Sequence, residues 1–546
     1  MNLKSFLLLP LIYIFLMMNT CISKEKVDLV IYNAKVYTLN ASFDTATAFA
    51  VKEGKILAIG CDKEILSNFD AKQQIDAKGR ALYPGFNDGH SHFLAYGRAL
   101  IRWANLVGTS SFDDISAILK SHQKKFNASW ILGRGWDQND WKDQKYPTND
   151  KLDKLFPDTP VVLIRIDGHA VLANSTALQL AGINASTRID GGEVVLKNGK
   201  TTGILIDNAV DRLLALIPEM SREEKVKALL EAQKNCFAAG LTSITDAGLD
   251  KHDILLIDSL QQNGLLKIRD YAMMSPTDEN FEYFFKNGPL HKARLTVSAV
   301  KLYIDGALGS RGALLLKPYS DMPGHYGLRL HPLEYYDNIC QKAYDADFQV
   351  NTHAIGDSGN RIMLRTYARF LKGKNDRRWR IEHAQLLSPD DFHYFGDYSI
   401  IPSIQSTHCT SDMYWAGKRL GAIRLKSAYA YKKLLEQNGW EINGTDFPIE
   451  DISPLKTFYA AVSRKDLKGW PPGGFQAENA ISRKEALYSI TLWPAKGSFD
   501  EKQKGSIEIG KVADFVMLEK DIMHCPVSEI PLVKVLGTWL EGEKVY

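Results

Sequence analysis

The sequence predicts an α/β protein built on a (β/α)8 TIM-type barrel, with a small β-sandwich made from both chain ends and an inserted α/β subdomain. Two observations support this fold class. Across the middle of the 546-residue chain, eight short apolar runs alternate with helical stretches, as in a parallel sheet closed into a barrel. Short β-rich runs also lie near both termini. The hydrophobic fraction of 45% and the charged fraction of 24% are typical of a folded globular protein.

The two chain ends have the composition of short strands separated by turns. These apolar runs are 27–31, 35–38, 48–52, 55–59, 510–518 and 532–539. Glu53-Gly54 is predicted to be a hairpin turn. We therefore expect one composite sandwich from residues 21–83 and 503–546; the alternative is two unrelated β appendages.

The barrel is expected within residues 84–502. Its eight candidate strands are Ala81–Phe86, Thr242–Asp246, Ile268–Met274, Leu295–Tyr303, Gln349–His353, Trp379–His383, Ile400–Gln405 and Glu441–Asp446. The stretch between the first and second strands is far longer than a barrel loop and contains strand-like runs of its own. It predicts an inserted α/β subdomain at about 104–225.

Charge and cysteine content exclude several classes of protein. A net charge of +3 provides no strong field for nucleic acid or an anionic membrane. Six cysteines without a C-x-x-C pair exclude a disulfide scaffold and a finger-type zinc site. We expect a small-molecule substrate and no nucleic-acid partner, and the composition leaves homo-oligomer formation open.

The first twenty residues resemble an export signal. Lys4 precedes an apolar stretch from Phe6 to Met18, which as a helix spans about 20 Å and is too short for the ~30 Å hydrocarbon core. Cys21 follows where a bacterial lipoprotein carries its lipidated cysteine. The alternatives are ordinary cleavage and a retained anchor. All three predict an exported protein: a periplasmic or cell-envelope lipoprotein, or a secreted protein if Cys21 is not lipidated.

Polar side chains that suit a metal lie on or just after the predicted barrel strands. They are His90, His92, Lys301, His353, His383 and Asp446. His90 and His92 are two residues apart, so in an extended chain both imidazoles point to the same side. Because the carboxyl ends of barrel strands meet on one face, all six side chains are expected to converge there.

Motifs along most of the chain resemble those of the metal-dependent amidohydrolase superfamily, in the branch that includes N-substituted formamide deformylases. They are Pro84–His92, Gly306–Arg311, His353–Asp357, Arg380–Gln385, Gly444–Pro448 and Lys504–Leu518. The resemblance implies a barrel with a two-ended β-sandwich and a site for one or two divalent ions, usually Zn²⁺. Imidazole and carboxylate ligands suit zinc, which lowers the pKa of a bound water.

The resemblance also implies residue roles. His90 and His92 match the ligands of one metal, and His353 and His383 match those of a second. Asp446 matches a residue that touches the first metal and transfers the proton. Lys301 matches the position of a carboxylated lysine that bridges two metals; the alternative is an ordinary lysine.

The expected function is an exported metal-dependent hydrolase of amide-type C–N bonds, including N-formyl or N-acyl substrates. The alternatives are an ester or cyclic-amide hydrolase of the same fold and a non-catalytic ligand-binding lipoprotein. The candidate substrate contacts are Asp305, Arg311, His169 and His408. For Asp305 and Arg311 a structural salt bridge is the alternative. The insert motifs 134–139 and 167–169 are expected to cover the barrel mouth and enclose a ligand.

Overall fold

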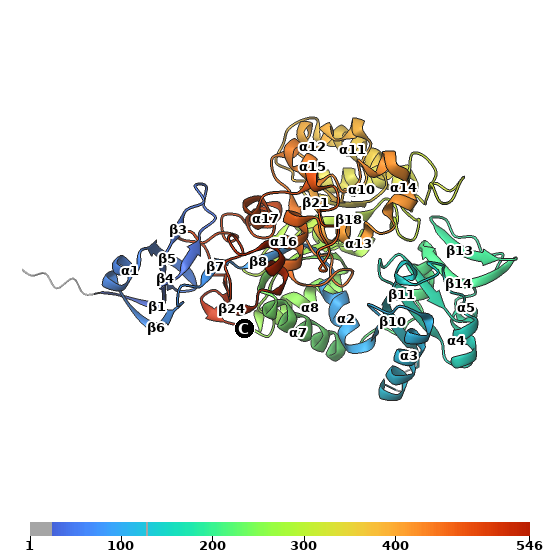
Figure 1. Ribbon diagram of the computed structural model, residues 1–546, viewed down its shortest axis with the longest axis horizontal. Coiled ribbons are helices and arrows are strands. Elements are labelled where there is room, and N and C mark those ends of the chain that lie inside the picture. Colours follow the sequence, from blue (N-terminus) through green and yellow to red (C-terminus); the bar gives the residue numbers. More distant parts are fainter. Residues whose placement is uncertain (1–23, 127–128) are drawn as a thin grey trace, which may run out of the picture.

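The computed structural model describes residues 24–126 and 129–546. Figure 1 shows three parts in a row, with the β-sandwich at one end, the barrel in the middle and the insert at the other end. No helix within the described ranges is long and apolar enough to cross a membrane. The predicted signal peptide and Cys21 lie outside the described residues.

The β-sandwich has two sheets around an apolar core. One sheet contains only N-terminal strands, in the order β5-β4-β1-β6, with bounds Lys55–Gly60, Ala48–Lys52, Glu25–Tyr32 and Phe69–Asp76. The other has the order β25-β24-β23-β7-β2-β3, with bounds Glu543–Lys544, Val535–Leu540, Phe515–Leu518, Ala81–Pro84, Lys35–Tyr37 and Thr45–Ala46. Strands from both chain ends therefore share the second sheet, and Leu29, Phe49 and Phe515 meet in the core between the sheets.

The barrel contains eight parallel strands, which confirms the predicted fold class. Their order is β8-β15-β16-β18-β19-β20-β21-β22, with bounds Phe86–Ser91, Leu241–Leu249, Arg269–Met274, Leu295–Tyr303, Gln349–Ala354, Arg380–His383, Ile401–Ile404 and Ile442–Asn443. A short antiparallel strand, β17 (Leu290–His291), pairs with β18 at the base of the sheet. Alternating helices cover the outside, as expected for buried parallel strands.

Helices follow the barrel strands in turn. They include α2 (Phe93–Arg102), α8 (Lys251–Gln262), α10 (Leu333–Asp345), α11 (Asp357–Leu371), α12 (His393–Asp397), α13 (Ser406–Asp412), α14 (Ala416–Leu425), α15 (Tyr431–Asn438), α16 (Pro454–Ser463), α17 (Arg483–Ser489) and α18 (Leu492–Gly497). Helix α7 (Arg222–Ala238) packs against α2 and leads back into β15.

The first predicted barrel strand, Ala81–Phe86, is wrong, because it joins two separate strands. Residues Ala81–Pro84 form β7 of the sandwich, where they pair with β23 and β2. The barrel strand β8 begins at Phe86. Both strands are fully buried, so their apolar residues form one continuous run in the sequence, and only Gly85 between them marks the change of sheet.

The barrel closes where β8 meets the segment after β22. Asp446 donates its backbone N–H to the carbonyl of His90 at 2.8 Å. A Cβ atom at Gly89 would lie 2.0 Å from Cγ2 of Ile442, and one at Gly444 would lie 2.4 Å from the backbone nitrogen of His90. Two glycines therefore permit the close backbone contact that closes the barrel beside the first histidine pair.

The insert is built around a mixed six-stranded sheet. Its order is β13-β14-β12-β11-β10-β9, with bounds Gly192–Lys197, Lys200–Asp207, Ala170–Ala173, Val161–Arg165, Ile131–Trp136 and Ala104–Asn105. Its helices are α3 (Phe112–Phe126), α4 (Asp150–Leu155), α5 (Ser175–Leu180) and α6 (Asn208–Leu214). Apolar clusters cover both faces of the sheet, so the insert has its own core.

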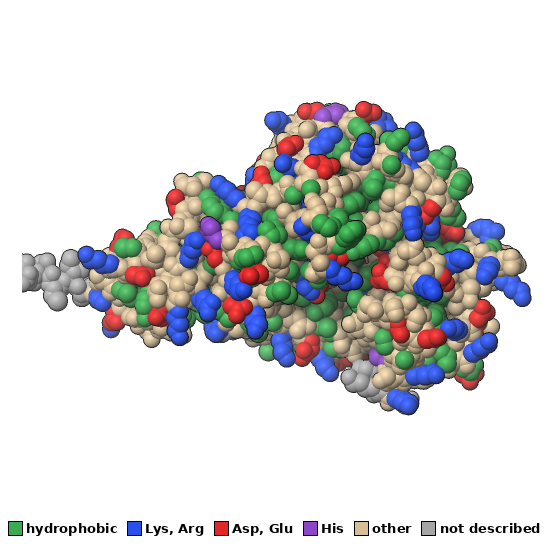
Figure 2. Space-filling view, viewed as in Figure 1, with side chains coloured by type: hydrophobic (Ala, Val, Ile, Leu, Met, Phe, Trp, Pro, Cys, Tyr) green, Lys and Arg blue, Asp and Glu red, His purple; other side chains and the backbone are tan. Residues whose placement is uncertain are grey.

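Surface charge agrees with the small net charge. Figure 2 shows acidic and basic side chains interspersed over the visible face, without a broad region of one sign among the described residues.

Candidate metal centre

The carboxyl ends of the barrel strands and the insert enclose one cavity of about 490 Å³. The barrel contributes His92, Lys301, His353, His383, His408 and Asp446 to its lining, and the insert contributes Asp137, Arg165, Asp167 and His169. The insert therefore covers the barrel mouth, as expected from its two motifs.

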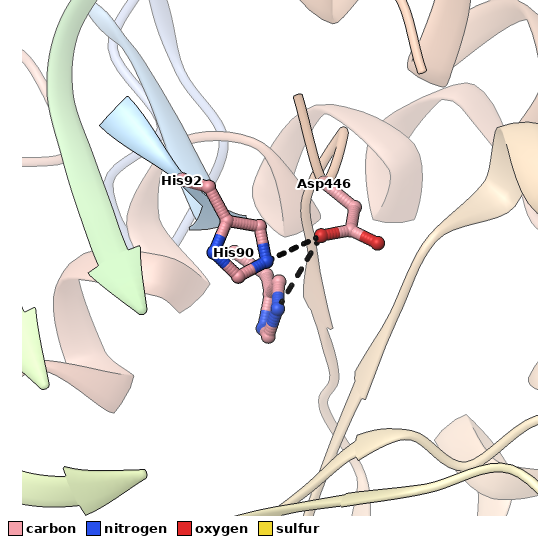
Figure 3. A group of neighbouring side chains, drawn as sticks. All are labelled: His90, His92 and Asp446. Carbon is pink, nitrogen blue, oxygen red and sulfur yellow. Dashed lines mark ion pairs between the residues drawn. The ribbon is translucent and has the colours of Figure 1, made fainter. Parts of the chain in front are cut away.

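Three side chains form one candidate ligand group: His90, His92 and Asp446 (Figure 3). His92 and Asp446 line the cavity. Oδ1 of Asp446 lies 3.6 Å from Nε2 of His90 and 3.2 Å from Nε2 of His92. No hydrogen-bond donor with suitable geometry reaches this oxygen within the described part of the chain. Two imidazole nitrogens and a carboxylate oxygen that converge in this way suit a divalent metal ion.

Local structure fixes these side chains. His90 lies in β8, and His92 is the residue that precedes helix α2. Asp446 has a left-handed backbone conformation (φ 59°), and His383 at the end of β20 has one as well (φ 72°). Such conformations are unfavourable for residues other than glycine and are frequent at functional sites.

A second candidate ligand group contains His383, His408 and Asp446, whose ligand atoms lie within 4.8 Å of one another. Nε2 of His408 is 3.6 Å from Oδ2 of Asp446, and it has no hydrogen-bond partner among the described residues. The sequence suggested His408 as a substrate contact, and the geometry adds it to the potential metal ligands.

His353 lies beside His383, and their ring centroids are 4.6 Å apart. Its Nε2 is 3.5 Å from the carbonyl of Gly306 and 3.6 Å from Oδ1 of Asp305. The structure therefore brings His353 and His383 together but does not include His353 in either convergent group.

Lys301 is buried inside the barrel and lines the cavity beside His90. Its Nζ is 3.2 Å from Nε2 of His90. Burial lowers the pKa of Lys301 to about 8, although Glu382 and Asp446 act in the opposite direction. A neutral amine is the form that carboxylation requires, so this environment is compatible with the modification implied by the resemblance.

The protonation states of the site suit metal binding. Burial, reinforced by Lys301, lowers the pKa of His90 to about 4. Burial also holds the pKa of His383 well below its usual range. For Asp446 burial raises the pKa, but His92 and His90 outweigh it and the pKa is well below 3.8. Neutral imidazoles and an ionised carboxylate are the forms that bind a metal ion.

Sequence reasoning missed the residues that orient these ligands. Glu382 is fully buried, accepts a short hydrogen bond from Nδ1 of His90 and is held by Arg380 at 3.0 Å. Gln405 lies 2.6 Å from Nδ1 of His383. Both occur in or beside predicted strands, but only the barrel brings them against the histidines. Such partners fix the ring orientation of a ligand.

The predictions for Asp305 and Arg311 as substrate contacts are not supported, because neither lines the cavity. Asp305 is fully buried and accepts hydrogen bonds from the backbone of Leu314, Ile355 and Gly356. Arg311 pairs with Asp321 at 2.8 Å. Arg311 therefore forms a structural salt bridge, which was the alternative, whereas Asp305 binds backbone N–H groups of neighbouring loops.

His169 lies at the cavity wall, where the insert meets the barrel. Its Nδ1 bonds to Oδ1 of Asp207 at 2.8 Å, and its ring centroid is 4.9 Å from that of His353. This position is compatible with the predicted substrate contact. Trp415 also lines the cavity, whereas Trp136 and Trp141 pack in the core of the insert.

Comparison with known proteins agrees with this architecture. A sequence model described as "Amidohydrolase family" matches residues 73–546. The chain belongs to the amidohydrolase family. The predicted resemblance is thus confirmed, and family membership together with the donor set supports a hydrolase.

Three curated proteins are similar to the chain over nearly their whole length. "Protein LONG AFTER FAR-RED 3" of Arabidopsis thaliana is 32% identical and covers 95% of this chain and 91% of its own length. YtcJ of Bacillus subtilis, whose name places it among the amidohydrolases, is 30% identical, with 94% and 98% covered. The N-substituted formamide deformylase of Arthrobacter pascens is 25% identical, with 94% and 97% covered.

A solved structure is also similar. It is an uncharacterised metal-dependent hydrolase from Pyrococcus horikoshii, with 27% identity and a TM-score of 0.75 over 92% of this chain and 99% of the other.

Proposed function

We propose that this protein is an exported, metal-dependent hydrolase of amide-type C–N bonds, with N-formyl or N-acyl amines as its substrate class. The observation that carries this proposal is the convergence of His90, His92 and Asp446, of which His92 and Asp446 line the cavity. The similarity to an N-substituted formamide deformylase and to a metal-dependent hydrolase supports it.

In this proposal His90, His92 and Asp446 hold one divalent ion, and His353 and His383 hold a second beside Lys301. The donor set favours Zn²⁺, because imidazole and carboxylate ligands suit this ion. When bound, such an ion activates water as a nucleophile and polarises a carbonyl group.

Asp446 transfers the proton. Its Oδ1 faces His90 and His92, whereas its Oδ2 faces His408. Oδ2 therefore accepts a proton from the attacking water and then returns it to the leaving nitrogen, as a general base followed by a general acid. His408 has a free Nε2 at this position and contacts the polar end of the substrate.

Export is proposed from the sequence. The apolar stretch from Phe6 to Met18 and the cysteine that follows it suit a signal peptide with lipidation at Cys21. The lipid on Cys21 would be the membrane contact of the protein.

The test is metal analysis and turnover on one preparation. Purified protein is measured by mass spectrometry for bound metal and assayed with N-formyl amines, N-acyl amines, esters and cyclic amides. Bound zinc with amide turnover supports the proposal. Preference for esters or cyclic amides supports the alternative substrates, and stoichiometric metal without any turnover supports a ligand-binding protein instead.

A further inference from the structure

A second cavity of about 380 Å³ lies beside the candidate metal centre. His92, His169 and Tyr303 line both cavities, so the two cavities are adjacent. Its remaining wall includes the apolar side chains Val210, Leu214, Leu330 and Tyr335 and the acidic residues Asp167, Asp207 and Asp211. Two of these carboxylates have partners, because Asp167 bonds to Arg165 and Asp207 bonds to His169. A substrate held at the metal centre can therefore extend one of its ends into this chamber.

Arg134 is the cationic side chain of this chamber. It lies on β10 directly opposite Ile164 of β11 and Asn105 of β9. A Cβ atom at Gly168 would be 3.9 Å from both terminal nitrogens of Arg134. The guanidinium therefore lies against the loop that carries His169.

Arg134 is half-buried, and two of its guanidinium nitrogens are buried without a hydrogen-bond partner among the described residues. Its Nε and Nη2 have no hydrogen-bond acceptor, and no ion pair includes Arg134, within residues 24–126 and 129–546. Burial lowers the pKa of Arg134 to about 10, so the side chain still carries its charge at neutral pH. An unpartnered buried charge is unfavourable and is normally compensated by an opposite charge.

Arg165 on the neighbouring strand provides an internal comparison. It is more deeply buried than Arg134, and its guanidinium bonds to Gln138 at 2.8 Å, to Asp167 at 2.6 Å and to Asp137 by a short ion pair. Asp167, whose negative charge acts on Arg134, is thus already bonded to Arg165. The insert therefore satisfies one buried arginine completely and leaves the other with free donors toward the chamber.

Free donors on Arg134 identify the class of ligand. Nε and Nη2 lie on one edge of the planar guanidinium, and two parallel donors on one edge match the two oxygens of a carboxylate. We propose that Arg134 binds a carboxylate group of the substrate, so that the preferred amides carry an acid group at one side of the scissile bond. This inference rests on the proposed function and specifies its substrate class. The carboxylate can belong either to the acyl part or to the amine part of the substrate.

Two matched substrate pairs show whether the carboxylate belongs to the acyl part or to the amine part of the substrate. N-formylphenylalanine and N-formyl-2-phenylethylamine differ by a carboxylate on the amine part. N-benzylsuccinamic acid and N-benzylbutanamide differ by a carboxylate on the acyl part. In one of the pairs we expect kcat/KM of the wild type to be about tenfold or more higher for the acid. The Arg134→Gln variant should bring that ratio close to one, mainly through KM, and Arg134→Lys should restore part of it.

Arg361→Gln is the matched control. Arg361 lies on α11 outside both cavities and pairs with Asp391 at 2.8 Å, so its loss should leave the acid-to-neutral ratio unchanged. Circular dichroism and metal content of each variant identify a folding defect. If Arg134→Gln does not fold, the test uses Arg134→Lys, whose acid-to-neutral ratio should lie between one and the wild-type ratio. Equal ratios for the wild type and the Arg134 variant would overturn the carboxylate site.

Binding measured by calorimetry separates this inference from the proposed function. Carboxylate-selective binding of N-benzylsuccinamic acid or of N-formylphenylalanine that is lost in Arg134→Gln, without hydrolysis of any amide, supports the site and contradicts the proposed hydrolase. Hydrolysis that is indifferent to the carboxylate contradicts the site alone. Neither selective binding nor hydrolysis contradicts both.

Discussion

At the scale of single residues, Asp446 occupies the central position of the candidate site. One carboxylate oxygen faces His90 and His92, and the other faces His408. Its left-handed backbone and its N–H bond to His90 hold the side chain in this position. In the proposed function, ligation and proton transfer therefore involve different atoms of Asp446, so a single substitution can separate them.

Replacing Asp446 with Asn should abolish proton transfer more than metal binding. The amide retains one oxygen but cannot accept the proton, and loss of a positioned general base typically costs about 10²–10⁴ in rate. Metal content should fall much less, because the histidines remain. The check is kcat and metal stoichiometry on the same preparation. Activity within about tenfold of the wild type would exclude Asp446 as the base.

The two candidate ligands beside His383 can be separated by metal analysis. In His353→Ala we expect the second ion to be lost, because the family resemblance assigns that histidine to it. In His408→Ala we expect metal content to be retained and kcat/KM to fall, because the proposed function assigns His408 to a substrate contact. Mass spectrometry of the metal content of both variants shows which histidine holds the second ion. Loss of metal in His408→Ala alone would assign the second ion to His383, His408 and Asp446 instead.

At the scale of elements, the barrel depends on the close contact between β8 and the end of β22. In Gly89→Ala the new methyl group would lie 2.0 Å from Ile442. We expect the free energy of unfolding to fall by about 1–3 kcal/mol, because overpacking forces the two strands apart. Urea unfolding measures this change.

Gly473→Ala is a matched control for the contact between β8 and the end of β22, which we call the seam. A Cβ atom at Gly473 would have no neighbour within 4 Å, so Gly473→Ala should be close to neutral. Combining Gly89→Ala with Ile442→Val should recover part of the lost stability. A Gly89→Ala protein as stable as the wild type would mean that the seam tolerates a wider spacing.

In the sandwich, Asp521 joins the C-terminal chain to N-terminal strands. It accepts hydrogen bonds from Lys35 at 2.8 Å and from Tyr37 and Tyr83 at 2.9 Å. Burial raises the pKa of Asp521, but these bonds outweigh it and lower the pKa from 3.8 to about 2. Because the folded-state pKa is depressed, the stabilisation is complete above about pH 4 and is lost as the pH falls toward about 2.

Asp521→Asn should therefore destabilise the protein by about 1–2 kcal/mol at neutral pH, and the difference from the wild type should shrink at pH 3. Urea unfolding at pH 7 and pH 3 measures both values. The control is Asp28→Asn, which removes an ion pair with the exposed Lys72 and should cost less than about 1 kcal/mol. A difference that is independent of pH would contradict the role of the ionised carboxylate.

At the scale of the whole molecule, the sandwich and the insert lie at opposite ends of the barrel (Figure 1). The first described strand, β1, belongs to the sandwich, so the chain enters the fold far from the insert and the cavity. A lipid at Cys21 would therefore attach the sandwich end to a membrane and leave the cavity accessible to small molecules.

This arrangement leads to a prediction about location. Cys21→Ser should release the protein from the membrane fraction or prevent its maturation, because the acyl chain has no other acceptor in the signal. Fractionation and mass spectrometry of the mature N-terminus test it. Unchanged membrane association without an acyl group on Cys21 would contradict the lipoprotein proposal.

Much of the architecture was predictable because buried parallel strands are continuous apolar runs, and seven of the predicted barrel strands coincide closely with observed ones. The convergence of the candidate ligands His90, His92 and Asp446 was predictable because they lie at the carboxyl ends of strands, which meet on one face. The exception was Ala81–Phe86, since two buried strands of different sheets are both apolar and only Gly85 separates them.

Periodicity and motif spacing are local properties of the chain, so they were sufficient to predict the α/β barrel, the family and the set of chemically capable side chains. Which of these side chains meet depends on the tertiary structure. It placed Glu382 against His90, brought His408 to Asp446 and directed Asp305 to backbone N–H groups. Among residues 24–126 and 129–546 it left Nε and Nη2 of Arg134 without a hydrogen-bond partner while satisfying Arg165. The physical reason is that hydrogen bonds and ion pairs depend on distances of a few ångströms between residues far apart in sequence, which no local pattern encodes.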